Sequence, residues 1–115
     1  ALLHIDNAYY LANVQVQNYL CKTNTVSSTA FRGFGGNQGM MVIENIIDNI
    51  SRYLKKDSAD VRKINFYQKN NKNITHYGMK IEDNVIQEIF NKLIKKSNYK
   101  KRYLKIKKFN LNEKY

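Results

Sequence analysis

Glycine is concentrated in one part of this chain, and that cluster most constrains the local fold. Four of the five glycines lie within residues 33–39. A helical pattern follows directly, because apolar residues then recur at steps of three and four. These residues are Met40, Ile43, Ile46, Ile47, Ile50 and Leu54. The sequence therefore predicts a tight glycine turn that opens into an amphipathic helix.

The chain ahead of the glycines has a different period. Residues 14–17 alternate as Val-Gln-Val-Gln, a period of two that predicts a strand over residues 11–20. Residues 21–28 are small and polar, which predicts a loop. Because one strand cannot pair its own edges, we expect its partner to lie outside this sequence.

Further helices are predicted after the first. One spans residues 58–64, where Asp57 can cap its N-terminus. A polar loop over residues 67–78 separates it from a helix that starts near Asp83. The apolar stripe of that helix is Ile86, Ile89, Phe90, Leu93 and Ile94. Residues 99–109 form a last segment with Tyr103, Ile106 and Phe109 on one face and lysines elsewhere, and we expect a basic helix or a frayed end there.

Length and composition limit the fold class. A chain of 115 residues is at most one modest domain, and the predicted elements make it α+β, with one or two strands and three to four helices. It has no Pro and a single Cys, which excludes collagen-like and disulfide-scaffold chains. No apolar run approaches the roughly 18 residues of a membrane span. The chain begins at Ala1 rather than Met, so we expect an internal piece of a longer protein.

The formal charge of +11 arises entirely from the second half. Residues 1–54 hold three basic and three acidic side chains, so residues 55–115 carry 17 basic and six acidic ones. Such asymmetry is typical of a nucleic-acid or acidic-membrane surface. A drift toward the residues of A/T-rich codons is the other interpretation, since Lys, Asn, Ile and Tyr supply 53 of 115 residues. We favour the drift, and a small basic nucleic-acid-binding protein stays as the alternative.

The glycine turn is the best candidate binding site. Successive backbone N–H groups of such a turn can face one point, with the positive end of the helix dipole behind them. Phe34, between the glycines, offers a flat face to a planar ligand, and Arg32 adds a permanent charge. The alternative is a plain structural turn, with Phe34 as a hydrophobic plug beneath it and Arg32 as an ordinary surface residue. The spacing matches neither the dinucleotide fingerprint nor the P-loop.

The other candidate residues carry less weight. Cys21 is the only cysteine, which excludes a disulfide or a cysteine metal cluster, and we expect it to be buried and structural. His4 with Asp6 is too little for a metal site, and His76 is expected to be an ordinary hydrogen-bonding loop residue. No carboxylate pair is placed for acid–base catalysis. The sequence predicts a binding loop with no catalytic residue and no metal ligand.

A longer motif resembles the molybdenum-binding subunit of the xanthine dehydrogenase family. That family carries Cys-Lys-Thr-Asn-Thr, followed by Thr-Ala-Phe-Arg-Gly-Phe-Gly-Gly-Pro-Gln-Gly. Residues 21–25 match the first part, and residues 29–39 match the second except at one position. Residues 4–7, 60–67 and 73–78 fit as well, so the resemblance covers nearly the whole chain. It is most similar to the bacterial form, which has a separate molybdenum subunit.

The resemblance implies a fold and a division of the chain. The chain is expected to be a fragment of the molybdopterin-binding domain of a larger α/β subunit. Residues 1–39 would supply the strand and the cofactor and substrate loop. Residues 40–98 would be the helices, and residues 99–115 a basic helix or frayed tail.

The resemblance also assigns residues and partners. Arg32 and Gly33 would contact the molybdenum–molybdopterin cofactor, and Phe34 would stack on the purine substrate. The family hydroxylates hypoxanthine and xanthine to urate and passes electrons through 2Fe–2S clusters and FAD to NAD. We expect the FAD and iron–sulfur subunits or domains of that enzyme as partners, in the cytoplasm, with neither a membrane nor nucleic acid.

Two further expectations follow from the family pattern. The catalytic glutamate lies far downstream, so this chain alone should be inactive. Another molybdenum hydroxylase, acting on aldehydes or other N-heterocycles, stays open as an alternative.

The sequence departs from the family at three prolines, which are replaced by Ala12, Asn37 and Ser58. We expect Asn37 to cap the helix that follows the glycines. Losing a proline gives the unfolded chain more conformational freedom. This lowers the free energy of unfolding by about 0.4–1 kcal/mol per site. A slightly lower stability is therefore expected.

Overall fold

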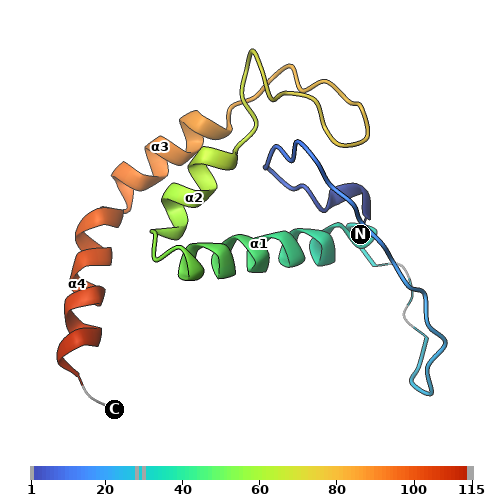
Figure 1. Ribbon diagram of the computed structural model, residues 1–115, viewed down its shortest axis with the longest axis horizontal. Helices are drawn as coiled ribbons and strands as arrows, with labels where there is room; N and C mark the ends of the chain where they lie inside the picture. The colour runs from blue at the N-terminus through green and yellow to red at the C-terminus, as the bar shows by residue number, and fades with distance from the viewer. Residues whose placement is uncertain (1, 28, 30, 114–115) are drawn as a thin grey trace. The chain divides into compact units, whose positions relative to one another are not determined.

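The computed structural model describes residues 2–27, 29 and 31–113. Its helices, in chain order, are the 3₁₀ turn η1 (Leu2–His4), α1 (Gly36–Tyr53), α2 (Ser58–Asn65), α3 (Ile86–Lys96) and α4 (Tyr99–Asn112) (Figure 1). The chain divides into two compact units, Ala1–Asn84 and Val85–Tyr115. The predicted number of helices is confirmed.

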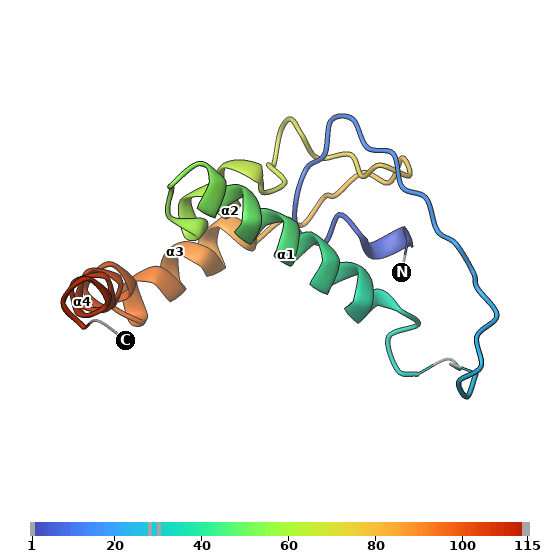
Figure 2. The ribbon, with the colours of Figure 1, turned by 60° about the horizontal axis from the view of Figure 1, so that its bottom comes forward.

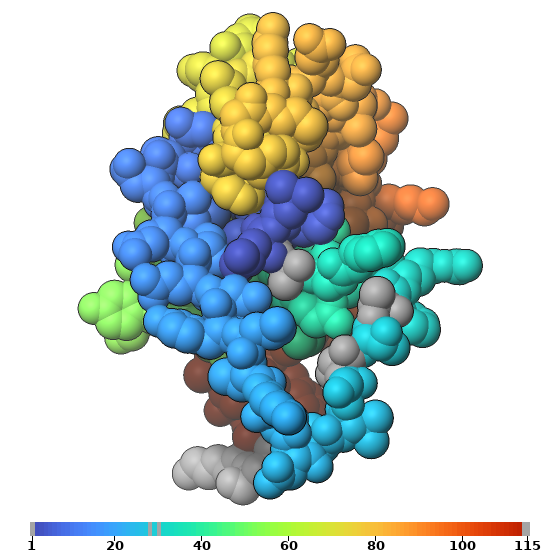
Figure 3. Space-filling model, turned by 90° about the vertical axis from the view of Figure 1, so that its right-hand side faces the viewer, coloured from blue at the N-terminus to red at the C-terminus, as the bar shows by residue number. Residues whose placement is uncertain are grey.

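The strand predicted over residues 11–20 is wrong for the part of the chain that the structure describes. These residues carry no regular secondary structure and cross one face of the first unit as an extended segment (light blue in Figures 2 and 3). The side chain of Leu20 is 98% exposed. A strand is defined by hydrogen bonds to a neighbour, and no described strand lies beside this segment. Pairing within the described chain is limited to two isolated bridges, Tyr9 with Phe66 and Ile74 with Lys80.

Helix α1 begins at Gly36, within the glycine cluster itself. Its buried face includes Ile43 and Ile47, one turn apart, and Ser51 continues that row. Other members of the predicted apolar stripe are partly exposed, among them Ile46 at 45% and Leu54 at 48%. The helix was therefore predicted correctly, but only part of its apolar stripe is covered.

Helix α2 matches its prediction closely. The Asp57 side chain accepts a hydrogen bond of 2.8 Å from the Ala59 N–H, as expected of an N-terminal cap. Ala59 and Val61 are buried. Helices α1 and α2 pack against each other in the first unit.

The core of the first unit joins the N-terminal segment to the chain that follows α2. The Tyr10 N–H donates to the Asn65 carbonyl (2.8 Å), and the Tyr67 N–H donates to the Ala8 carbonyl (3.1 Å). Tyr9 is 1% exposed, and its ring stacks on Phe66 with the centroids 5.7 Å apart. These contacts hold residues 8–10 beside residues 65–67 and so place η1 next to the start of α1 (Figure 1).

The second unit consists of α3 and α4. The expected start of α3 near Asp83 is wrong, because the helix begins at Ile86, and Val85, at its N-cap, makes no capping hydrogen bond through its side chain. Asn98 separates the two helices with a left-handed φ of 50°, a conformation that asparagine tolerates at a helix end. Helix α4 continues to Asn112, beyond the point where we expected fraying; residues 114–115 lie outside the described residues.

Candidate functional site

The glycine turn consists of two overlapping hydrogen-bonded turns ahead of α1. The Phe34 N–H donates to the Phe31 carbonyl (3.0 Å), and the Gly36 N–H donates to the Gly33 carbonyl (2.7 Å). Three consecutive residues have positive φ: 98° at Gly33, 48° at Phe34 and 75° at Gly35. Glycine adopts this region freely, whereas a residue with a side chain does so at a cost of about 1–2 kcal/mol. The predicted tight turn is confirmed, and its backbone strain falls on Phe34.

The side chains of the turn face solvent. Phe34 is 83% exposed and Phe31 is 81% exposed. Arg32, between Phe31 and Gly33, is exposed as well. The interpretation of Phe34 as a hydrophobic plug is therefore wrong. The turn presents two aromatic rings and a guanidinium group outward.

The start of α1 has no capping side chain among the described residues. Gly35 is its N-cap and makes no capping hydrogen bond through a side chain, and the first turn of the helix holds no acidic residue. The first N–H groups of a helix have no partner within the helix, and they carry the positive end of its dipole. The expectation that Asn37 caps this helix is wrong, because Asn37 lies inside it. This end of α1 can accept an anion or an electron-rich oxygen.

Gly36 allows a close approach between two distant parts of the chain. A Cβ at this position would lie 3.2 Å from Cδ2 of His4. The ring of His4 therefore packs against the first residue of α1, next to the glycine turn. Nothing in the sequence links residue 4 to residue 36, so this contact could not be predicted from it.

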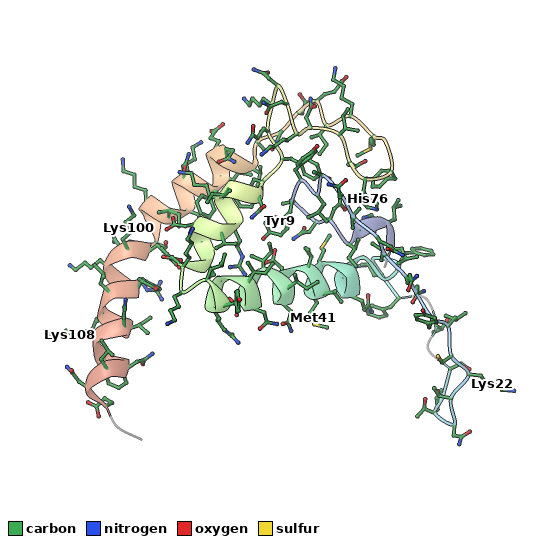
Figure 4. All side chains as sticks on the ribbon, viewed as in Figure 1. Tyr9, Lys22, Met41, His76, Lys100 and Lys108 are labelled. Carbon is green, nitrogen blue, oxygen red and sulfur yellow. The ribbon has the colours of Figure 1, made fainter. Side chains whose placement is uncertain are left out.

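A carboxylate on α1 holds the N-terminal segment in place. One oxygen of Glu44 accepts hydrogen bonds from the Tyr9 hydroxyl (2.6 Å) and the Asn7 side-chain amide (3.0 Å). The other accepts from Nε of Arg62 on α2 (2.9 Å). Burial raises the pKa of Tyr9 well above its usual value, and the hydrogen bond and charge of Glu44 raise it further. Figure 4 shows Tyr9 where the N-terminal segment meets the helices.

A second carboxylate, that of Asp6, is buried, whereas Glu44 is half-buried. Asp6 is 4% exposed, and its Oδ2 accepts a hydrogen bond of 2.6 Å from the Tyr67 hydroxyl. Burial raises the pKa of Tyr67, and the hydrogen bond and charge of Asp6 raise it further. Nδ1 of His76 lies 3.6 Å from the same oxygen (Figure 4). That nitrogen is buried with no hydrogen-bond partner among the described residues, so the expectation for His76 is wrong at this atom.

The remaining candidates do not form a site. Cys21 is exposed, so the expectation that it is buried is wrong. It lies in the loop that projects from the first unit, next to Lys22 (Figure 4). Among the described residues, no group of three His, Cys, Asp or Glu side chains could hold a metal ion. Within the same ranges, no helix has the length and apolar character needed to cross a membrane.

The chain is similar to known proteins over its whole length. Residues 1–66, which include the whole glycine turn, match the family described as molybdopterin cofactor-binding domain. The chain belongs to this family. Over all 115 residues it is 39% identical to the xanthine dehydrogenase of Dictyostelium discoideum and 41% identical to that of Calliphora vicina. Over 110 residues, 96% of this chain, it is 41% identical to the xanthine dehydrogenase/oxidase of Gallus gallus.

The chain covers only a small part of the length of these relatives. The chain spans about 8% of the length of each of the three. The resemblance inferred from the glycine motif is confirmed, and the chain corresponds to a segment of a xanthine dehydrogenase-type molybdenum enzyme. The bacterial form with a separate subunit is tested by none of these relatives and stays a prediction.

Proposed function

We propose that this chain is part of a xanthine dehydrogenase, which hydroxylates hypoxanthine and xanthine to urate at a molybdenum–molybdopterin centre. The observation that carries the proposal is the exposed ring of Phe34, at a positive φ beside Arg32 and the uncapped start of α1. A flat apolar ring suits a flat heterocycle. Family membership and the identity to xanthine dehydrogenases support the same reaction.

The residues of the turn fit the cofactor. Arg32 and Gly33 would hold the molybdopterin group, because the charge of Arg32 and the uncapped helix start both favour anionic, oxygen-rich ligands. Gly33 has a φ of 98°, which a residue with a side chain rarely adopts, so a substitution there would strain the turn. When bound, the cofactor supplies a metal centre that takes up two electrons as oxygen from water is added to the purine.

The role of this chain in the reaction is to bind and orient. Phe34 would stack on the purine, and no residue of the chain is assigned a catalytic role. The chain alone is therefore expected to be inactive. In the complete α/β enzyme, 2Fe–2S clusters and FAD on other domains or subunits would carry the electrons to NAD, in the cytoplasm.

Replacing Phe34 in the complete enzyme tests the proposal. Stacking of a base on an aromatic ring is worth about 1–3 kcal/mol, so Phe34→Ala should lower kcat/KM for xanthine about tenfold or more. The molybdenum content should not change. Phe31→Ala is the matched control, because Phe31 is equally exposed and lies three residues earlier. It should have little effect on turnover.

Two outcomes would contradict the proposal. Unchanged xanthine kinetics in Phe34→Ala would remove Phe34 from the substrate site. Efficient turnover of aldehydes, with none of xanthine, would assign the chain to another molybdenum hydroxylase. Steady-state assays of the unaltered enzyme with both substrate classes decide the second question.

A further inference from the structure

Helix α4 has a charge distribution that works against its own stability. It holds six basic residues and no acidic one among its 14 residues. Three of the basic residues, Lys100, Lys101 and Arg102, follow directly after its first residue. They lie at the positive end of the helix dipole, where cations are unfavourable. Asn98, at the N-cap, makes no capping hydrogen bond through its side chain.

Repulsion within the helix adds to this effect. Lys101 and Lys105 are four residues apart, and Lys105 and Lys108 are three apart, so each pair shares a face. Like charges at these spacings destabilise a helix. Residues 100–112 are all exposed (Figure 4 labels Lys100 and Lys108). An isolated helix of about this length is marginal in water even with a favourable sequence.

Helix α4 also leaves apolar side chains uncovered. Leu104 is 63% exposed, Ile106 56%, Phe109 51% and Leu111 76%. Arg102 and Lys105 line one shallow groove together with Ile106 and Phe109. The surface therefore combines cationic groups with apolar ones, as the rim and centre of a protein interface do.

We propose that α4 docks on an acidic protein surface with an apolar centre, contributed by another domain or subunit of the same enzyme. Carboxylates beside the first turn would offset both the dipole and the lysine repulsion, and the apolar centre would cover Leu104 and Leu111. A nucleic-acid backbone would neutralise the positive charge of α4 but would leave these aliphatic side chains in water. The choice of partner rests on the proposed function, because it takes the chain as part of a larger enzyme.

Hydrogen exchange of the α4 amides in the complete enzyme tests the proposal through the sign of the effect. The variant carries Lys100→Gln and Lys101→Gln. If α4 stands alone, removing two cations from its first turn relieves repulsion, and the amides exchange more slowly. If α4 is docked on carboxylates, the loss of two ion pairs weakens docking. We expect exchange to become about fivefold faster or more.

A matched variant and a nuclease treatment complete the experiment. Lys69→Gln with Lys72→Gln removes two exposed lysines from the loop after α2 and should leave α4 exchange unchanged. Slower or unchanged exchange in the α4 variant overturns the proposal. So does a loss of α4 protection when the unaltered enzyme is treated with nuclease, which would make nucleic acid the partner. Xanthine turnover and molybdenum content of the same preparations report separately on the proposed function.

Discussion

Glu44 and Phe34 lie close together in the sequence, and their surroundings have opposite characters. Every group around Glu44 finds its partner inside the chain: Asn7, Tyr9 and Arg62 all donate to its carboxylate. The glycine turn fixes its backbone through local hydrogen bonds but leaves Phe34 in solvent. The first region determines where the N-terminal segment lies. The second is an exposed, hydrogen-bonded turn, which we propose as the binding surface for the cofactor and the substrate.

The largest effect is expected from breaking the Glu44 cluster. Glu44→Ala leaves the partly buried Arg62, Asn7 and Tyr9 without their acceptor, which should lower the free energy of unfolding by about 2–3 kcal/mol. Urea denaturation of the purified protein measures it. Glu88→Ala is the control, because its ion pair with Lys92 is largely exposed and should be worth less than about 1 kcal/mol. Equal losses in the two variants would show that the Glu44 cluster is not structural.

A smaller effect on stability is expected at alkaline pH, and it arises from two buried tyrosines, Tyr9 and Tyr67. The pKa values of Tyr9 and Tyr67 are raised in the folded state, so folding disfavours both phenolates. Their contribution is fully present below the unfolded pKa of about 10 and is lost as the pH rises toward the folded values. Thermal unfolding from pH 8 upward should show Tm falling above about pH 10.

Two variants show which tyrosines cause the decline of Tm at alkaline pH. Tyr9→Phe with Tyr67→Phe should flatten the decline of Tm above about pH 10. Tyr53→Phe should keep it, because Tyr53 is 87% exposed. A decline that persists unchanged in the double variant would point to lysines instead.

The smallest effect on stability is expected from replacing a glycine, either in the glycine turn or in an ordinary loop. Gly33 and Gly78 both have positive φ, 98° and 87°. Alanine at either position should therefore destabilise the protein by about 1 kcal/mol. Only Gly33→Ala should also reduce the molybdenum content of the complete enzyme, which metal analysis measures. Equal molybdenum content in both variants would remove Gly33 from the cofactor site.

The sequence predicted what depends on neighbouring residues. The apolar spacing after the glycines located α1, and Asp57 located the start of α2, because helix period and capping are local properties. The glycine turn followed from composition in the same way. The start of α3 was not located in this way, because the helix begins at Ile86, three residues beyond Asp83.

What the sequence could not predict depends on distant partners. The strand over residues 11–20 has the right alternation but no described neighbour. Cys21 was expected to be buried from the usual behaviour of cysteine, yet its loop projects away from the core. His4 packs against Gly36, and three side chains donate hydrogen bonds to Glu44. These contacts join segments that only the fold brings together.

The left-handed backbone at Phe34 has a consequence for the thermodynamics of binding. Because Phe34 lies between two glycines that also have positive φ, in a hydrogen-bonded turn, the direction of its Cα–Cβ bond is set before any ligand arrives. An aromatic side chain then has only two torsions left to immobilise. When a ligand stacks on this ring, the protein would lose little conformational entropy, so most of the contact free energy would appear as affinity.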